Sequence, residues 1–426
     1  AAGGAATRTV TLDRDLRDVV VMGNRLLVTR FRSAETLVVD PRGSVTQRIT
    51  LPSSSSVASN TAEVAWRAAA APGGGLWMLH QRVGAAPVQL TSTRPYYESS
   101  LSACPGTAGI VRPALALLRP PEAPLVLPDV PFAPLAVDVA VAPSGDRVAV
   151  AEPGNIGGTR PQVHESSVSS ASCFSSMRSV TIRAGQAVAV AYAPTGVLIT
   201  QTRAPATLVF NADAVVALGG RAEAHAGHQL FHSNPDGLLA CASCHPEGDD
   251  DSHTWNFAAV GLRRTQYIRG GLLGSEPFHW SGDLRDFDAL VAEVMVHRMG
   301  ATMPAPQNIR SLAGWVDRLP PRARPVVDVA AAARGAALFR DDAVGCAGCH
   351  AGPRYTNSET VDVGTGGSFQ VPSLLGLAWR APYLHDGRAP TLRARFDASG
   401  GGDMHGHTSQ LTSAQIDDLV AFMETL

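Results

Sequence analysis

The chain has 426 residues, of which 45% are hydrophobic, 35 are basic and 37 are acidic. The formal net charge of −2 gives no reason to expect nucleic acid or an acidic membrane surface as a partner. No run approaches the ~18 uninterrupted apolar residues of a membrane span, so we expect none. The length predicts two or three domains. All the basic residues are Arg, which excludes chemistry based on Lys.

The first half of the chain predicts an all-β domain over residues 1–220. Short β-type runs are separated there by Gly, Pro, Asn and Asp. A unit of four such strands lies near the N-terminus, and similar units follow at Ala136–Ala151 and Ala187–Phe210. The repeat of roughly 40–50 residues is typical of β-propeller blades. About four blades can be counted, and a β-sandwich remains the alternative. In the clearest unit the predicted strands are Val19–Met22, Leu26–Thr29, Thr36–Val39 and Val45–Ile49.

Two pentapeptides in the second half carry the chemistry. Cys241-Ala-Ser-Cys244-His245 recurs in form as Cys346-Ala-Gly-Cys349-His350. C-x-x-C-H is the attachment signature of a c-type haem, in which two thiols bind the vinyl groups and the His binds iron. A four-Cys zinc site would leave both histidines unexplained, and a redox dithiol would not need a second copy. We therefore expect two covalent haem c groups, held by Cys241, Cys244 and His245 (haem 1) and by Cys346, Cys349 and His350 (haem 2).

Haem attachment of this kind takes place outside the cytoplasm, so we expect a periplasmic or otherwise exported protein. The opening residues, Ala1–Ala6, have no basic or long apolar region, which indicates a mature or trimmed form without its signal peptide. The two remaining cysteines, Cys104 and Cys173, lie in intervals 84–113 and 154–178, which we predict to be long loops. In an oxidising compartment they are free to form a disulfide, and two separate buried thiols are the alternative.

From about residue 221 the pattern becomes helical. A Gly-x-x-Leu-Phe run precedes each haem motif, at Gly227–Phe231 and Gly335–Phe339, which indicates a duplicated cytochrome lobe. We place the first lobe at 221–320 and the second at 321–426, joined by a Pro-rich linker over 319–325. The pattern also predicts an amphipathic helix over Leu284–Met299 and a last helix that begins at a capping box, Thr412-Ser-Ala-Gln415.

Residues 221–426 resemble the bacterial dihaem cytochrome c peroxidases and the MauG superfamily. Besides the haem motifs, His279-Trp280-Ser-Gly-Asp is similar to the family's F-W-D-G-R, and 369–392 (FQVPSLLGLAWRAPYLHDGRAPTL) is similar to K-V-P-T-L-R-N…A-P-Y-F-H-D-G…A-T-L. The resemblance implies that haem 1 is the peroxidatic haem and haem 2 passes electrons to it. It also implies that Trp280 lies on the electron path; a core aromatic is the alternative.

The resemblance suggests sixth ligands for the two irons. For haem 1, Ser252-His253-Thr254-Trp255 is similar to the family loop with a displaceable His, so His253 is the candidate; the alternative is an exposed loop His. For haem 2 we favour His405, with Met404 and His407 as alternatives. A calcium ion between the lobes is left open.

The chain departs from the family at two positions that move protons. Leu290 and Gly300 stand where the family has Gln and Glu. Glu293 and His297 lie one turn apart and are predicted to share a helix face, where they are candidates for acid–base work; a solvated ion pair is equally compatible.

The resulting functional hypothesis is a periplasmic dihaem oxidoreductase of the peroxidase class. It would reduce hydrogen peroxide at haem 1, with electrons from a small periplasmic donor protein, or would oxidise a partner protein in the manner of MauG. The β domain suits partner docking. Two alternatives are a dihaem electron-transfer cytochrome without peroxide chemistry and a dioxygenase-like haem enzyme.

Overall fold

The computed structural model describes residues 8–426 except 54–59, 90–108, 131–132, 159, 169–177, 181, 212, 220–224, 235 and 238. Cys104 and Cys173 lie outside the described residues, so their predicted disulfide stays a prediction. Labelling of free thiols in the unfolded, unreduced protein would test it. No helix among the described residues is both long and apolar enough to span a membrane.

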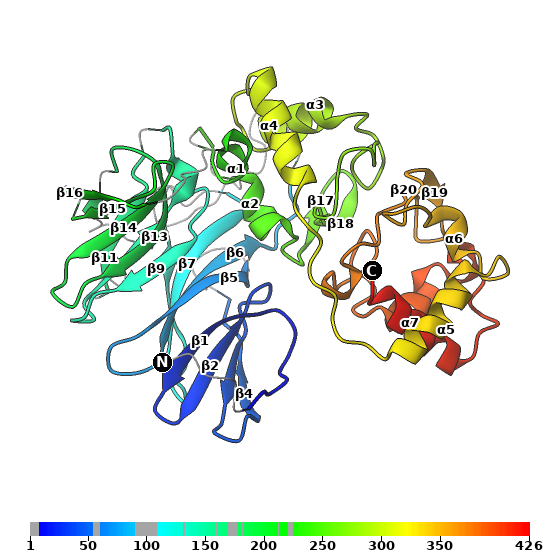
Figure 1. Cartoon of the computed structure of the whole chain (residues 1–426), viewed down its shortest axis with the longest axis horizontal. Helices are drawn as coiled ribbons and strands as arrows, with labels where there is room; N and C mark the ends of the chain where they lie inside the picture. The colour runs from blue at the N-terminus through cyan, green and yellow to red at the C-terminus, as the bar shows by residue number, and fades with distance from the viewer. Residues whose placement is uncertain are drawn as a thin grey trace.

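The described residues of the N-terminal half form four antiparallel four-stranded sheets, in which the strands follow each other in chain order (Figure 1). The first strands of neighbouring sheets, β1, β5, β9 and β13, contact one another in sequence, as the inner strands of propeller blades do. The propeller-like prediction is therefore confirmed. The strands are β1 Leu16–Met22, β2 Arg25–Arg30, β3 Thr36–Val39, β4 Val45–Ile49; β5 Asn60–Ala70, β6 Leu76–Gly84, β7 Val111–Leu118, β8 Leu125–Asp129; β9 Asp138–Val141, β10 Arg147–Ala151, β11 Val163–Ser167, β12 Arg178–Val180; and β13 Gln186–Tyr192, β14 Leu198–Arg203, β15 Thr207–Phe210, β16 Ala214–Ala217.

The predicted four-strand unit at the N-terminus is present, and its turn chemistry explains why. Gly23 adopts φ +61°, which glycine reaches at little cost, and closes the β1–β2 hairpin in which Val20 faces Leu27. The predicted loop over 154–178 is wrong in part, because β11 runs through it. The pattern did not indicate β11 because its polar and apolar residues alternate only weakly. The strand forms because each of its residues pairs with a residue of β10.

Helices are the main regular elements of the C-terminal half, which forms two lobes with the same plan. Each lobe packs a helix preceding its haem motif against a helix further along the chain. The first lobe contains α1 Ala226–Phe231, α2 Cys241–Cys244, β17 Thr254–Phe257, β18 Gly261–Arg264, α3 Phe287–Leu290, the π-helix η3 Val291–Arg298 and α4 Pro306–Asp317. The second contains α5 Val329–Arg340, α6 Cys346–Cys349, β19 Thr360–Asp362, β20 Ser368–Gln370 and α7 Ser413–Met423. Short 3-10 turns complete the secondary structure. One, η1 Pro153–Asn155, lies in the third blade, and the lobes contain η2 Pro246–Gly248, η4 Leu377–Trp379, η5 Arg393–Phe396, η6 Ala398–Gly400 and η7 Gly402–His405.

The shared Gly-x-x-Leu-Phe runs have the same role in both lobes. A Cβ on Gly227 would lie 2.1 Å from the carbonyl oxygen of Ser311 in α4, and a Cβ on Gly335 would lie 1.9 Å from that of Asp418 in α7. Only glycine permits helices to cross this closely. The predicted capping box is also present: Thr412 accepts a hydrogen bond from the Gln415 amide at the start of α7.

The first lobe shares a hydrophobic core with the blades, whereas the second lobe has its own. One cluster joins Trp77 and Val148 of the second and third blades to Phe231, Met295 and Ile309 of the first lobe. The core of the second lobe is formed around Phe339, Leu419 and Phe422. The haem 1 motif therefore sits on a rigid base that includes the β domain.

Candidate haem sites

The first C-x-x-C-H forms α2, which is hydrogen-bonded to the segment between the second and third blades. The Ser243 hydroxyl donates to the carbonyl oxygen of Pro134 at 2.7 Å and accepts from the Ala240 amide at 3.0 Å. Nδ1 of His245 lies 3.1 Å from the Asp249 carbonyl oxygen, so the ring is oriented with Nε2 left to bind a metal. Burial raises the pKa of the Cys241 thiol to about 12, as expected for a thiol in an apolar cavity.

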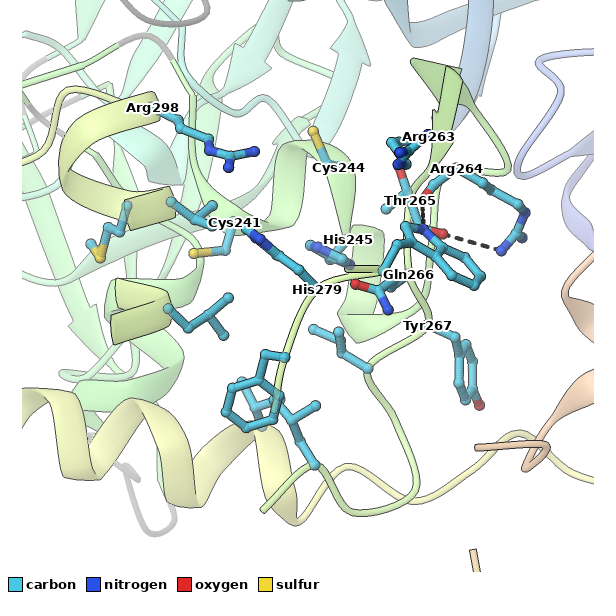
Figure 2. A pocket seen from close by; sticks show the side chains of 18 of the residues that line it. Cys241, Cys244, His245, Arg263, Arg264, Thr265, Gln266, Tyr267, His279 and Arg298 are labelled. Carbon is cyan, nitrogen blue, oxygen red and sulfur yellow. Dashed lines mark hydrogen bonds between the residues drawn. The ribbon is translucent and has the colours of Figure 1, made fainter. Parts of the chain in front are cut away.

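A cavity of about 390 Å³ opens beside this motif, within the size range of cofactor pockets. Figure 2 shows the side chains of His279 and Arg298 in the same space as Cys241 and His245. Its apolar walls include Phe278, Phe287, Leu290, Val291, Val294, Met295 and Met299.

The charge of the cavity fits a haem with its two propionates. Among the described residues, five guanidinium groups line it and only one carboxylate, that of Asp283, does so. Two of these arginines are almost fully buried, and Nε of Arg264 and Nε of Arg380 have no hydrogen-bond partner among the described residues. Arg264 pairs with Asp250 at 2.7 Å, but Arg380 forms no ion pair with the described carboxylates, and an anionic cofactor would relieve the cost of burying that charge. The five are Arg263, Arg264, Arg269, Arg298 and Arg380.

His253, the candidate ligand of haem 1, is not among the residues that line this cavity. Its Nδ1 lies 3.4 Å from the Glu63 carboxylate in β5, and its ring packs edge-on against Trp255. Burial lowers the pKa of His253, but Glu63 and Asp251 outweigh burial and raise it overall, which favours the charged form that cannot bind iron.

Glu293 and His297 do share a helix face, but the face is directed to solvent. The His297 side chain is 70% exposed, and Glu293 pairs with Arg298 at 2.9 Å. The π-helical winding of η3 aligns residues five apart and so brings Glu293 to Arg298, while Val294 and Arg298 line the cavity. Helix formation also begins at Phe287, capped by Asp286, later than the predicted Leu284.

His279 is the histidine that sequence reasoning missed. It lines the cavity together with His245, and its Nδ1 lies 3.3 Å from Asp283, which leaves Nε2 unengaged among the described contacts. Its φ of +70° is unusual for a residue other than glycine and is a common feature of functional positions. The available signal was its place directly before Trp280, where the family's F-W-D-G-R motif has Phe.

Trp280 lies where the two lobes meet. Its Nε1 donates to the Arg264 carbonyl oxygen at 2.7 Å, and its own carbonyl oxygen accepts from the Gln370 amide of the second lobe at 2.8 Å. The indole also lines the haem 1 cavity and contacts the ring of His385 edge-on, with 6.4 Å between centroids. His385 in turn stacks on Phe369 at 3.8 Å, so aromatic rings extend from the cavity into the second lobe.

In the second site the structure brings His350 and His405 together. Their ring centroids are 6.4 Å apart and their planes are tilted by 33°. At this spacing the two histidines could hold one haem iron between them, at iron–nitrogen distances of about 2.0 Å. Nδ1 of His350 lies 3.0 Å from the Tyr355 carbonyl oxygen and Nδ1 of His405 lies 3.2 Å from that of Gly400, so each Nε2 is left for a metal.

The other two candidates for this position face outward. Met404 is 62% exposed, and His407 is exposed. Arg395, whose guanidinium donates to the His405 carbonyl oxygen, is partly buried, and desolvation lowers its pKa to about 10. It forms no ion pair with the described carboxylates, so this site also suits an anionic cofactor.

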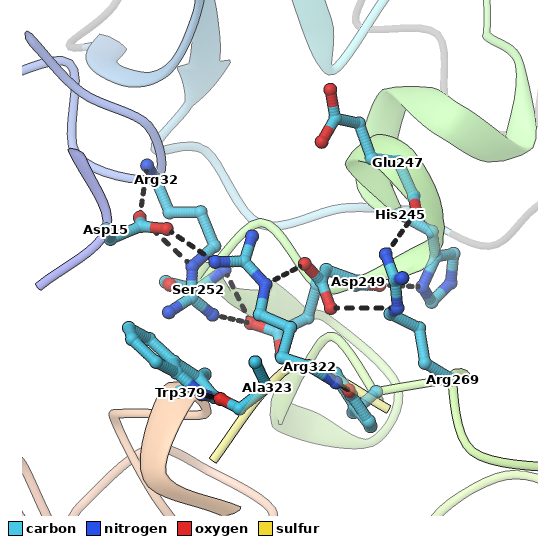
Figure 3. A network of polar contacts seen from close by, with 12 residues as sticks. Asp15, Arg32, His245, Glu247, Asp249, Ser252, Arg269, Arg322, Ala323 and Trp379 are labelled. Carbon is cyan, nitrogen blue, oxygen red and sulfur yellow. Dashed lines mark hydrogen bonds and ion pairs between the residues drawn. The ribbon is translucent and has the colours of Figure 1, made fainter. Parts of the chain in front are cut away.

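A buried polar network connects the haem 1 motif to the other parts of the chain (Figure 3). The side chain of Asp249, whose carbonyl oxygen accepts from His245, pairs with Arg322 of the linker. Arg322 also pairs with Asp15 of the β domain at 3.1 Å, and Asp15 pairs with Arg32 at 3.2 Å.

The neighbouring Asp250 is engaged in the same way. It pairs with Arg264 at 2.7 Å and with Arg32 at 3.2 Å. Burial would raise its pKa, but these arginines outweigh burial and hold the pKa below its usual value. Among the described residues no group of three or more His, Cys, Asp or Glu side chains is arranged to hold a metal ion. The neighbouring carboxylates of Asp249 and Asp250 therefore give no support to a calcium site.

Comparison with known proteins agrees with the geometry of the C-terminal half. Residues 332–426 match the cytochrome c family. The gamma subunit of hydrazine synthase from Kuenenia stuttgartiensis is 26% identical over 257 residues, covering 45% of this chain and 72% of that protein. MauG, the methylamine utilization protein of Methylorubrum extorquens, is 33% identical over 121 residues, which span 22% of this chain and 34% of MauG. A solved chain of Kuenenia hydrazine synthase superposes with a TM-score of 0.43 at 23% identity, covering 47% of this chain and 86% of that one.

A cytochrome c domain implies covalent haem c at Cys346–His350 and a role in redox chemistry or electron transfer. The predicted resemblance of the second half to the MauG superfamily is likewise confirmed by the match to MauG. The chain thus combines an all-β, propeller-like half with a helical half that contains a cytochrome c domain and is related to MauG and to hydrazine synthase subunit gamma.

Proposed function

We propose that the protein is an exported dihaem oxidoreductase that reduces hydrogen peroxide at the first haem site, with electrons delivered through the second. Covalent haem would be held by Cys241, Cys244 and His245 in one lobe and by Cys346, Cys349 and His350 in the other. Bound haem iron supplies the redox centre, at which peroxide takes up two electrons and two protons and becomes two waters. A MauG-like variant, in which the electrons come from a partner protein, uses the same site.

The observation that carries the proposal is the asymmetry of the two sites. In the second site His405 and His350 lie close enough to hold one haem iron between them, which would leave no position there for peroxide. The first site has a cavity of about 390 Å³ beside His245. This difference supports one reactive and one relaying haem, with Trp280 between them.

The residues of the first cavity would position and protonate peroxide. His279 has Nε2 available and Nδ1 beside Asp283, so it can hold a proton at Nε2 and regain it through the carboxylate. Arg298 adds a positive charge, which favours an anionic oxygen. His279 thereby takes the role first assigned to Glu293 and His297, and it replaces His253 as the histidine nearest the reaction.

The test compares His279→Phe with His253→Phe in the haem-loaded protein. Loss of a proton-transfer group lowers rates by about 10²–10⁴-fold. We expect His279→Phe to slow peroxide consumption by at least about 10²-fold, and His253→Phe to change it by less than about threefold. Slowing by the His253 variant alone would restore His253 to the site and contradict our assignment.

The alternative is a dihaem electron-transfer cytochrome. It would be favoured if Nε2 of His279 bound the haem 1 iron, because that iron would then have no open position for peroxide. In that case the ferric protein would be entirely low-spin and would not bind cyanide at either haem. A high-spin signal from one haem, together with cyanide binding at that haem, is the result expected for the peroxide-reducing protein.

A further inference from the structure

A second cavity lies on the other side of α1 from the haem 1 motif, and the functions discussed above do not use it. It has a volume of about 980 Å³ and is lined by residues of the first strand of every blade: Arg17, Arg67, Asp138 and Gln186. Residues of α1 and α4 line it from the first lobe. We call this space the central channel.

The central channel contains more positive than negative charge. Arg17 pairs with Glu247 at 2.6 Å, and Arg67 pairs with Asp138 at 3.4 Å, so these four charges balance. Arg203, at the end of β14, is the fifth charged side chain in the channel. None of the described carboxylates lies within ion-pairing distance of it. A free guanidinium in a polar cavity is suited to bind a carboxylate through two parallel hydrogen bonds.

The side of the channel formed by the first lobe is aromatic. The rings of His228 and His232 stack at 4.2 Å, and both meet Trp315 edge-on at 5.4 and 5.5 Å. Nδ1 of His232 is engaged with the His228 carbonyl oxygen at 2.8 Å, so its Nε2 can hydrogen-bond a ligand. Flat rings beside an available cation are suited to an aromatic carboxylate.

This aromatic side leads directly to the haem 1 cavity. The Trp315 ring lies 4.7 Å from the ring of Phe231, centroid to centroid. Phe231 is 2% exposed and lines the haem 1 cavity, while Trp315 lines the central channel. Two rings in contact therefore separate a ligand in the channel from haem 1.

We propose that the central channel binds a phenolic carboxylate, an aromatic anion with oxidisable hydroxyl groups, and that its electron enters haem 1 through Trp315, as a second route beside the one through haem 2. Each phenol gives up one electron and one proton and becomes a phenoxyl radical. Two phenols and one hydrogen peroxide thus yield two radicals and two waters. The electron-entry part rests on the proposed peroxide reduction, whereas the binding part does not.

Binding is tested first, by calorimetric titration of the ferric haem-loaded protein with gallate and with pyrogallol. These compounds differ only in the carboxylate. We expect gallate to bind at least about tenfold more tightly than pyrogallol. Arg203→Gln should abolish that difference, while Arg178→Gln, at a 63% exposed position on β12, should preserve it. Equal affinities for gallate and pyrogallol in the parent protein, or a preference that survives Arg203→Gln, would overturn the site.

Electron entry is tested by the rate at which peroxide drives gallate oxidation. Trp315→Phe preserves an aromatic ring against Phe231 but removes the readily oxidised indole, and it should slow gallate oxidation by at least about tenfold. Trp66→Phe is the matched control, because Trp66 lines the same channel but packs on Phe31 instead. Gallate oxidation as fast in the Trp315 variant as in the control would refute the path. A protein that consumes no peroxide with any donor would refute the proposed function and this path together, and the titration would still decide the site.

Discussion

The linker residue Arg322 is expected to hold the haem 1 motif, the β domain and the second lobe together. It pairs with Asp249, which is 1% exposed, and with Asp15 at 3.1 Å, and its guanidinium lies over the Trp379 ring at 5.8 Å. Arg322→Gln would leave Asp249 buried beside a single remaining arginine, Arg269, at 3.9 Å.

Removing one partner of a buried ion pair costs about 3–5 kcal/mol. The Arg322 side chain is 21% exposed and Arg269 compensates in part, so we expect Arg322→Gln to lower the free energy of unfolding by about 2 kcal/mol. Because the Asp249 carbonyl oxygen orients His245, the reduction potential of haem 1 should shift as well.

Urea unfolding of the haem-loaded protein, followed by Soret absorbance, measures the loss of stability. Arg324→Gln is the matched control, since Arg324 is exposed on the same linker and no ion pair of the described residues involves it. If both variants unfold within about 0.5 kcal/mol of each other, the network does not have the role we infer.

Three further predictions concern the haem lobes. His405→Ala should make haem 2 high-spin in electron paramagnetic resonance spectra, whereas Met404→Ala, at an exposed position, should leave it low-spin. A low-spin haem 2 in the His405 variant would exclude His405 as the ligand. Trp280→Phe should slow oxidation of haem 2 by peroxide at least about tenfold in stopped-flow absorbance, and an unchanged rate would remove Trp280 from the electron path. Gly335→Ala should destabilise the second lobe by about 3 kcal/mol in thermal unfolding, because its Cβ meets the Asp418 carbonyl oxygen at 1.9 Å, whereas Gly348→Ala, with nothing within 4 Å, should cost less than about 1 kcal/mol.

Local sequence was sufficient for the features whose chemistry is local. A C-x-x-C-H motif contains both thiols and the proximal histidine within five residues, so Cys241–His245 and Cys346–His350 could be recognised without a fold. The first-blade hairpin and the cap at Thr412 were predictable for the same reason, since turns and caps depend on neighbouring residues.

The distal side of haem 1 depended on the tertiary structure. A motif fixes the proximal ligand, but the distal group comes from wherever packing brings another segment, and here packing places His279, and not His253, among the residues that line the haem 1 cavity. Glu293 does not line the haem 1 cavity, although the spacing alone allowed either face of the helix to do so. The central channel was likewise beyond sequence reasoning, because its walls come from five strands and two α-helices that only the fold brings together.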